Sequence, residues 1–334
     1  MHYPSKIGRA QILIPILAGV AAFYFFTMGP NRIDFTDYPS LRPTPDHTVA
    51  IRFDPSFYYE GRPRPKKLAR RLAEKWRKAG VNTVFYRAYD PRHGAFYKTD
   101  YRYNKEGDFG RHGLMEALLA ACHDHDIRVF AWFPVMNHAG AWEAHPQWRT
   151  RTPEGSDYRA TGLEYPLCAR NPDARRWWTG FLTDFLETYP GIDGVDLGEP
   201  VVAWTKEAGC ACDVCRKAMA LTSEPAVQVR ARSLTTLIGD AIAGIRQFDK
   251  PVSVTTVQPA HADGRLLSFA ELSAITGFDL TGVLHAPENR RPDIICPEFI
   301  WQELKSRHGP ETDSPFDPDW TETAVRHFIR QLDA

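Results

Sequence analysis

Two carboxylates lie close together at the end of one short apolar run in the middle of the chain. Asp196 and Glu199 belong to the segment GIDGVDLGEP at 191–200, and Glu298 lies within another apolar run at 292–304. Two carboxyl groups on either side of a bond can serve as general acid and as base or nucleophile, which is what cleavage of a glycosidic bond requires. We therefore take Glu199 as the candidate acid and Asp196 or Glu298 as its partner.

Side chains suited to binding sugar hydroxyls or stacking on sugar rings lie near the ends of the apolar runs. These candidate substrate-binding residues are Arg52, Asp54, Tyr86, Arg87, Asp90, Trp132, Asn137, His138, Gln258, His285 and Trp301. Asp54 and Asp90 each precede a proline and so also suit the start of a turn, and Arg87 also suits an ion pair with Asp90. No two histidines stand four apart on a helix beside a carboxylate, so we predict no metal at this site and no cofactor.

These residues need a scaffold that gathers strand ends, and the chain alternates between the two kinds of element. Strands are predicted at 47–54, 81–90, 128–138, 191–200, 250–259, 278–287 and 292–304. Helices are predicted at 65–80, 112–127, 171–190, 225–249, 268–277 and 319–332. This alternation indicates a parallel sheet covered by helices, and no glycine-rich phosphate-binding motif follows the first strand. We predict a TIM-type (β/α)8 barrel over 47–334, incomplete at the C-terminus because no eighth strand is recognisable.

The first 31 residues are typical of a membrane anchor. Residues 12–28 are apolar apart from Thr27, and no charge occurs between Arg9 and Arg32. With its flanks, this stretch reaches the roughly 17–25 residues that cross a bilayer, and the basic residues before it favour a cytoplasmic N-terminus. A cleaved signal peptide is the alternative, but the aromatic end of the stretch offers no small-x-small cleavage site. We expect a single-pass inner-membrane protein with a linker at 32–46 and a periplasmic or extracellular body.

Three of the six cysteines form a C-x-C-x-x-C cluster: Cys210, Cys212 and Cys215. Outside the cytoplasm, two of them can form a disulfide that staples their loop, which is the arrangement we expect. The alternative is a metal site, which would need a fourth ligand from elsewhere, such as Cys168. The formal net charge is zero, and the chain therefore has no overall field that would attract nucleic acid.

Several segments resemble known carbohydrate-active barrels. Residues 81–91, 129–135, 171–175 and 192–196 resemble glycoside-hydrolase-like barrels of the family 10-like group. They are also similar to the hydrolase domain of the bacterial poly-N-acetylglucosamine export enzyme. Gly-Glu-Pro at 198–200 is similar to the Asn-Glu-Pro of many retaining glycosidases, with Gly198 in place of the asparagine that contacts the sugar. The resemblance implies polysaccharide cleavage by acidic residues at the end of the fourth strand, here Asp196 and Glu199.

Two functions fit these observations. The first is a membrane-anchored glycoside hydrolase that acts on an exopolysaccharide or cell-wall glycan, with partners in an exopolysaccharide system. The second is a non-catalytic carbohydrate-binding or assembly subunit with a degenerate barrel. The separation of the two carboxyls distinguishes these functions. Retaining enzymes hold them about 5–5.5 Å apart and inverting enzymes about 6.5–9.5 Å apart, and a much larger separation favours a binding protein.

Overall fold

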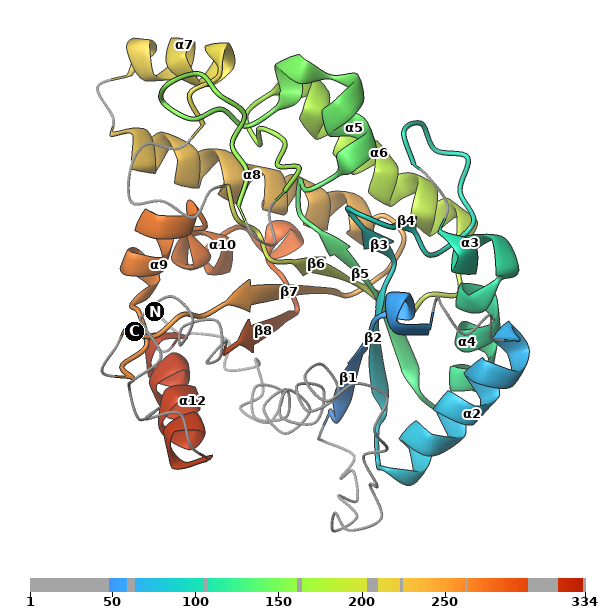
Figure 1. The fold of residues 1–334 in the computed structure, drawn as a ribbon. Helices are drawn as coiled ribbons and strands as arrows, with labels where there is room; N and C mark the ends of the chain where they lie inside the picture. The colour runs from blue at the N-terminus through green and yellow to red at the C-terminus, as the bar shows by residue number, and fades with distance from the viewer. Residues whose placement is uncertain are drawn as a thin grey trace, which may run out of the picture.

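The computed structural model describes residues 48–58, 64–104, 107–160, 164–202, 210–222, 225–261, 264–299 and 318–332. Within them, six parallel strands form one sheet (Figure 1). Their order in the sheet is β1 (Ala50–Phe53), β2 (Thr83–Arg87), β5 (Arg128–Pro134), β6 (Gly194–Gly198), β7 (Val252–Val257) and β8 (Ile294–Glu298). A small antiparallel pair, β3 (Tyr89–Asp90) and β4 (Gly94–Ala95), follows β2. The curled parallel sheet is that of a partial TIM-type barrel.

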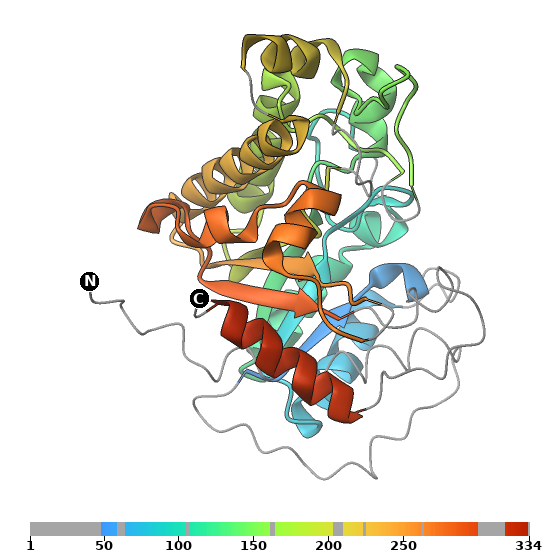
Figure 2. The same cartoon turned by 90° about the vertical axis from the view of Figure 1, so that its left-hand side faces the viewer.

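Helices connect successive strands and pack around the sheet (Figures 1 and 2). The longer ones are α2 (Pro65–Lys78), α4 (Leu114–His123), α6 (Pro172–Thr188), α8 (Ala226–Arg246) and α12 (Pro318–Leu332). The shorter ones are α3 (Asp108–His112), α5 (Ala139–Ala144), α7 (Asp213–Leu221), α9 (Phe269–Thr276) and α10 (Leu280–Leu284). Single turns occur at η3 (Pro55–Tyr58), η4 (Pro146–Trp148) and η5 (Glu288–Arg290). Sheet order follows chain order, so neighbouring strands are joined by local crossovers.

The α6 helix illustrates how local sequence and packing agree. The Asn171 side chain accepts hydrogen bonds from the backbone N–H groups of residues 173 and 174, which caps the helix start. Phe181 and Phe185 are fully buried on this helix and meet Phe133 of β5 with ring centroids 5.3 and 4.9 Å apart. Edge-to-face contacts of this kind add to the free energy of burying the rings. They fix the position of β5 and of the loop that follows it.

The predicted sixth strand at 278–287 is wrong, because this segment contains helix α10. The Asp279 carboxylate accepts a hydrogen bond from Gly282 N–H at 2.9 Å and so caps a short helix. A short apolar run does not by itself distinguish a strand from a buried helix. The run predicted as the seventh strand supplies β8, the sixth strand of the described sheet.

The prediction that the chain is held in the membrane by a transmembrane helix is wrong for the described residues. Among the helices that the structure describes, none combines the length and the apolar character needed to cross a bilayer. The stretch that suggested an anchor at 1–31, the linker at 32–46 and Trp301 all lie outside the described residues.

Candidate active site

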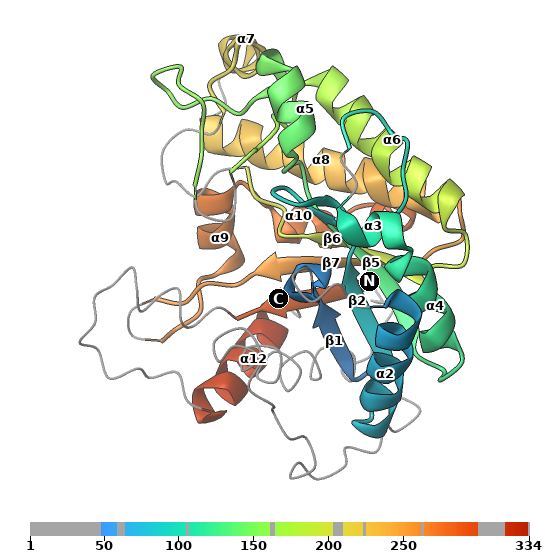
Figure 3. The ribbon, with the colours of Figure 1, turned by 45° about the vertical axis from the view of Figure 1, so that its right-hand side comes forward.

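Three charged side chains from distant parts of the chain meet at the carboxyl ends of the strands. Arg52 lies on β1, Glu298 ends β8, and Glu199 directly follows β6. Arg52 Nη1 lies 3.2 Å from Glu298 Oε1 and 3.8 Å from Glu199 Oε1. Arg52 and Glu298 are 246 residues apart, and their contact follows from the curl of the sheet, which has β1 and β8 at its two ends (Figure 3). We call these three residues the carboxylate site.

The carboxylate site is open to solvent and compact. The side chain of Arg52 is 27% exposed, and those of Glu199 and Glu298 are each 34% exposed. Because both carboxylate oxygens lie within 3.8 Å of one nitrogen, the two distances limit their separation to about 7 Å, which suits a paired-carboxyl mechanism. Burial lowers the pKa of Arg52, but Glu298, Glu199 and Asp196 together raise it above its usual value. Arg52 therefore remains charged beside the two carboxyls.

The backbone of Glu199 adopts a left-handed conformation, with φ of 51°. A long side chain rarely adopts this conformation, which costs on the order of 1–3 kcal/mol. Hydrogen bonds on both sides hold it: Glu199 N–H donates to Thr255 O at 2.8 Å, and Gly198 O accepts from Val135 N–H at 3.0 Å. Strain that the surroundings maintain in this way is concentrated at functional sites in proteins. The backbone conformation thus makes Glu199 a candidate for a functional role independently of its charge.

Gly198 makes room for Trp132. A Cβ atom at position 198 would lie 2.1 Å from Trp132 Nε1, which no side chain can tolerate without displacement of the indole. Packing therefore accounts for the glycine that stands where many retaining glycosidases have asparagine. Trp132 itself is 3% exposed, and the guanidinium carbons of Arg52 and Arg87 lie 5.3 and 5.2 Å from its ring centroid. Trp132 supports the two arginines by cation–π contact and presents no open surface for stacking on a sugar.

Asp196 lies beneath the carboxylate site. It is fully buried and accepts hydrogen bonds from Ser253 Oγ at 2.5 Å and Thr255 Oγ1 at 2.7 Å. Burial raises the pKa of Asp196, against the opposing effects of these hydroxyls and of Arg52. Sequence reasoning missed Ser253 and Thr255. The signal was available in the alternation of valine with hydroxyl residues along β7, whose Ser253 pairs in register with Asp196.

A second ionic group lies at the ends of β1 and β2. Arg87 Nη1 lies 2.5 Å from Asp54 Oδ2, and Arg87 Nη2 lies 2.6 Å from Asp90 Oδ2. Both aspartates also cap turns, as their position before proline suggested: Asp54 accepts from Ser56 N–H, and Asp90 accepts from His93 N–H. Burial raises the pKa of Asp90, but Arg87 and the backbone N–H groups outweigh it and lower the pKa. Arg87 thereby joins two turns at the same sheet edge.

Four other predicted substrate-binding residues are buried and hydrogen-bonded within the fold. Tyr86 OH donates to Phe96 O, Asn137 Oδ1 accepts from Tyr165 N–H, His138 Nε2 lies 2.6 Å from Asn104 Oδ1, and Gln258 Nε2 donates to Leu267 O. Each is at most 5% exposed, and burial lowers the pKa of His138 to about 3, so its imidazole is neutral. These groups satisfy buried backbone and side-chain partners and do not reach the surface.

His285 does not end a strand, because the segment that carries it is not a strand. It follows helix α10, and its Nδ1 lies 2.8 Å from Thr281 O within the same turn. The structure thus brings together Arg52, Glu199 and Glu298 from the predicted set, with Asp54, Arg87 and Asp90 at the same edge of the sheet. It does not place His285 among them.

The cysteines are arranged differently from the disulfide expected from sequence. Cys210, Cys212 and Cys215 gather with Cys168, and all four are free thiols. Cys168 Sγ lies 3.5 Å from Cys215 Sγ and 3.6 Å from Cys212 Sγ. A disulfide requires about 2.05 Å, so none of these contacts is a covalent bond. We call these four residues the cysteine cluster.

Comparisons with known proteins support the fold. No family model matches the chain, and no curated protein matches it. Its structure is similar to that of a β-galactosidase from the haloarchaeon Halorubrum lacusprofundi, with a TM-score of 0.52, 14% sequence identity and coverage of 82% of this chain and 42% of that one. It is also similar to that of a trehalose-6-phosphate hydrolase from Bacillus licheniformis, with a TM-score of 0.49 and 13% sequence identity. That match covers 85% of this chain and 54% of the hydrolase. The chain thus spans about half the length of these glycoside hydrolases or less, and shares with the first a TIM-barrel-like fold.

Proposed function

We propose that this protein is a glycoside hydrolase that cleaves O-glycosidic bonds in a bacterial polysaccharide, with residues 47–334 as its catalytic domain. One observation supports the proposal most directly: Glu199 and Glu298 both lie within 3.8 Å of Arg52 Nη1 at the carboxyl ends of the strands. Active sites of TIM-type barrels are built at this edge. Two partly exposed carboxyls in such a position supply the acid and the base or nucleophile that glycoside hydrolysis requires.

The two carboxyls have different surroundings, which suggests their roles. Glu298 accepts a hydrogen bond from Arg52 at 3.2 Å, whereas the closest Glu199 oxygen lies 3.8 Å from the same nitrogen. A carboxylate held by a guanidinium is suited to act as base or nucleophile. We assign this role to Glu298. Glu199 then protonates the oxygen of the leaving sugar, since it lies farther from the guanidinium and projects from the strained end of β6.

Asp196 was the other candidate partner, and its burial argues against direct contact with the sugar. We propose that Asp196 positions the site instead, because its negative charge acts on Arg52 from below the rim. Ser253 and Thr255 hold its carboxyl in a fixed orientation. Arg87, Asp54 and Asp90 lie at the same edge, and we propose that exposed parts of Arg87 bind sugar hydroxyls.

A non-catalytic carbohydrate-binding subunit is the second candidate, and one observation favours it. The ion pairs of Arg52 join β1 to β8 and to the end of β6, and such pairs also serve to hold a curled sheet together. Under this alternative, the carboxyls would be structural and the chain would bind glycan without cleaving it.

One experiment separates the two candidates. The full chain is incubated with a panel of bacterial glycans that includes exopolysaccharides, poly-N-acetylglucosamine and peptidoglycan, and released oligosaccharides are measured by mass spectrometry. The proposal predicts release from at least one glycan, and no release by the Glu298→Gln chain. Retention of a glycan by the wild type without release of any product would support the binding subunit.

A further inference from the structure

The cysteine cluster joins two segments that are separate in the sequence. Cys168 lies in the loop between β5 and α6, Cys210 and Cys212 precede α7, and Cys215 lies in its first turn. The four side chains are between 1% and 8% exposed. Their sulfur atoms all lie within 4.8 Å of one another. A thiol gains little from other thiols, so the approach of Cys168 to the three cysteines at 210–215 calls for a shared ligand.

The spacing of the sulfurs fits a metal ion. A tetrahedral zinc site with Zn–S bonds of about 2.3 Å has sulfurs about 3.8 Å apart. The Sγ–Sγ distances of 3.5 and 3.6 Å from Cys168, and the 4.8 Å limit for all pairs, bracket that value. A pair of disulfides would instead require two much shorter contacts. The C-x-C-x-x-C spacing places three ligands at the start of one helix, and Cys168 supplies the fourth corner.

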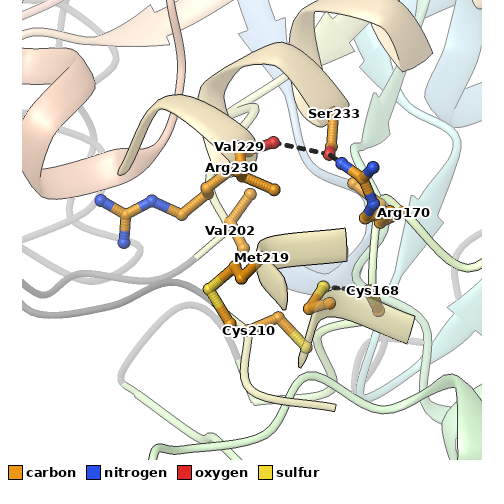
Figure 4. A pocket seen from close by; sticks show the side chains of 10 residues that line it. Cys168, Arg170, Val202, Cys210, Met219, Val229, Arg230 and Ser233 are labelled. Carbon is orange, nitrogen blue, oxygen red and sulfur yellow. Dashed lines mark hydrogen bonds between the residues drawn. The ribbon is translucent and has the colours of Figure 1, made fainter. Parts of the chain in front are cut away.

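The surroundings also suit thiolate ligands. Arg151 N–H donates to Cys210 Sγ at 3.4 Å, and Cys212 is the N-cap residue of helix α7. The positive end of a helix dipole favours negative charge at that position. The adjacent pocket is lined by the apolar Val202, Met219 and Val229, by three of the four cysteines, and by the polar Arg170, Arg230 and Ser233 (Figure 4). Four thiolates buried this deeply need a cation in direct contact with their sulfurs to balance the charge.

We propose that the cysteine cluster is a structural zinc site. Four thiolates fill a tetrahedral shell and leave no open position, which is the arrangement of structural and not catalytic zinc. This proposal departs from the sequence-based expectations of a disulfide and of a chain without metal. The site would fix the loop before α6 to the segment that follows Glu199, since Cys210 lies eleven positions after that residue. It does not depend on the proposed hydrolase activity.

Elemental analysis of the purified full chain, produced with zinc and without chelator, tests the proposal. We expect one zinc per chain, its release by a thiol-modifying reagent, and six free thiols after unfolding in chelator, because the sequence has six cysteines. Cobalt substituted for zinc should give the visible absorption of tetrahedral thiolate coordination. A metal-free wild-type chain lighter by two or four hydrogens would show disulfides and overturn the proposal, and so would stoichiometric iron.

Variants identify the ligands. Cys168→Ser and Cys212→Ser should each lose the bound zinc, whereas Cys122→Ser and Cys296→Ser should keep one zinc per chain. Cys122 and Cys296 are the matched controls, because both are buried free cysteines outside the cluster. Full zinc content in Cys168→Ser would contradict the assignment of the fourth ligand. The wild-type measurement remains decisive where a ligand variant does not fold.

Discussion

The carboxylate site and the cysteine cluster are both assembled from distant segments, but by different means. Arg52, Glu199 and Glu298 lie on or next to strands, and their side chains are 27–34% exposed. The four cysteines lie in loops and at one helix start, and are at most 8% exposed. Backbone hydrogen bonds of the sheet already position the first group, whereas in our proposal a common ligand holds the second group together. Changes at the carboxylate site should therefore reduce activity, and changes at the cluster should reduce stability.

The largest expected effect is that of zinc removal. Structural zinc contributes roughly 10–16 kcal/mol of apparent binding free energy in small domains. We expect a chelator to lower the unfolding free energy of this chain by about 3 kcal/mol or more, measured by urea unfolding. Glu298→Gln should show the same dependence on chelator, because its change leaves the cluster intact. Identical unfolding curves with and without chelator would contradict a stabilising role of the cysteine cluster.

A methyl group at position 198 should have the next largest effect. Gly198→Ala places a Cβ against the Trp132 indole at 2.1 Å, and overpacking of this kind costs about 1–3 kcal/mol. Displacement of Trp132 should also disturb Arg52, so activity falls together with the unfolding free energy. Gly244→Ala is the matched control: it lies in α8, nothing lies within 4 Å of its added Cβ, and we expect no loss of stability. Equal stability of the two variants would contradict the packing explanation.

The pH dependence of stability should have opposite signs at Asp196 and Asp90. The pKa of Asp196 is raised above its usual 3.8, so its contribution to stability is present below that pH and lost as the pH rises through the folded pKa. The pKa of Asp90 is lowered, so its contribution is present above pH 3.8 and lost as the pH falls through the folded pKa. Each unit of pKa shift corresponds to about 1.4 kcal/mol.

The measurement is the unfolding free energy across the acidic range for the wild type, Asp196→Asn and Asp90→Asn. As the pH rises from about 3.8, the wild type should lose stability relative to Asp196→Asn. As the pH falls below that value, it should lose stability relative to Asp90→Asn. If the unfolding free energies of both variants shifted relative to the wild type in the same direction with pH, a raised pKa for Asp196 and a lowered pKa for Asp90 would be contradicted.

The smallest expected effect is relief of strain at Glu199. Glu199→Gly removes the cost of the left-handed backbone and should raise the unfolding free energy by about 1 kcal/mol. Activity should be lost in the same variant, because the carboxyl is gone. Glu199→Gln keeps a side chain in the same conformation and should bring no gain in stability. A stability gain of equal size in both variants would indicate that charge, and not backbone strain, is responsible.

The sequence predicted the alternation of strands and helices well, because apolar runs and helical spacing are local signals. The Asn171 cap and the apolar face of α2, with Leu68, Leu72 and Trp76 buried, are examples. The prediction of a strand at 278–287 was wrong because its apolar residues suit either a strand or a buried helix. In the structure Asp279 caps a short helix there.

The candidate site was predicted only in part. Sequence reasoning found Arg52, Glu199 and Glu298 as strand-end residues, but their contact depends on the curl of a sheet whose ends are 246 residues apart. It could not show that Trp132, His138 and Gln258 are buried, because the residue type does not reveal on which side of the rim a side chain lies. Similarly, the sequence could name Cys168 only as one possible fourth ligand for the C-x-C-x-x-C cluster. The structure shows that its loop lies next to that cluster.

The turnover of Glu199→Gln and Glu298→Gln on a glycan that the wild type cleaves tests the central claim most directly. Each variant should lose at least about 10²-fold in kcat, the usual contribution of general acid or base catalysis, with its unfolding free energy little changed. Asp124→Asn serves as the control, because Asp124 is exposed at the end of α4, and it should retain wild-type turnover. Full turnover by either glutamine variant would contradict the assignment of Glu199 and Glu298 as the catalytic pair.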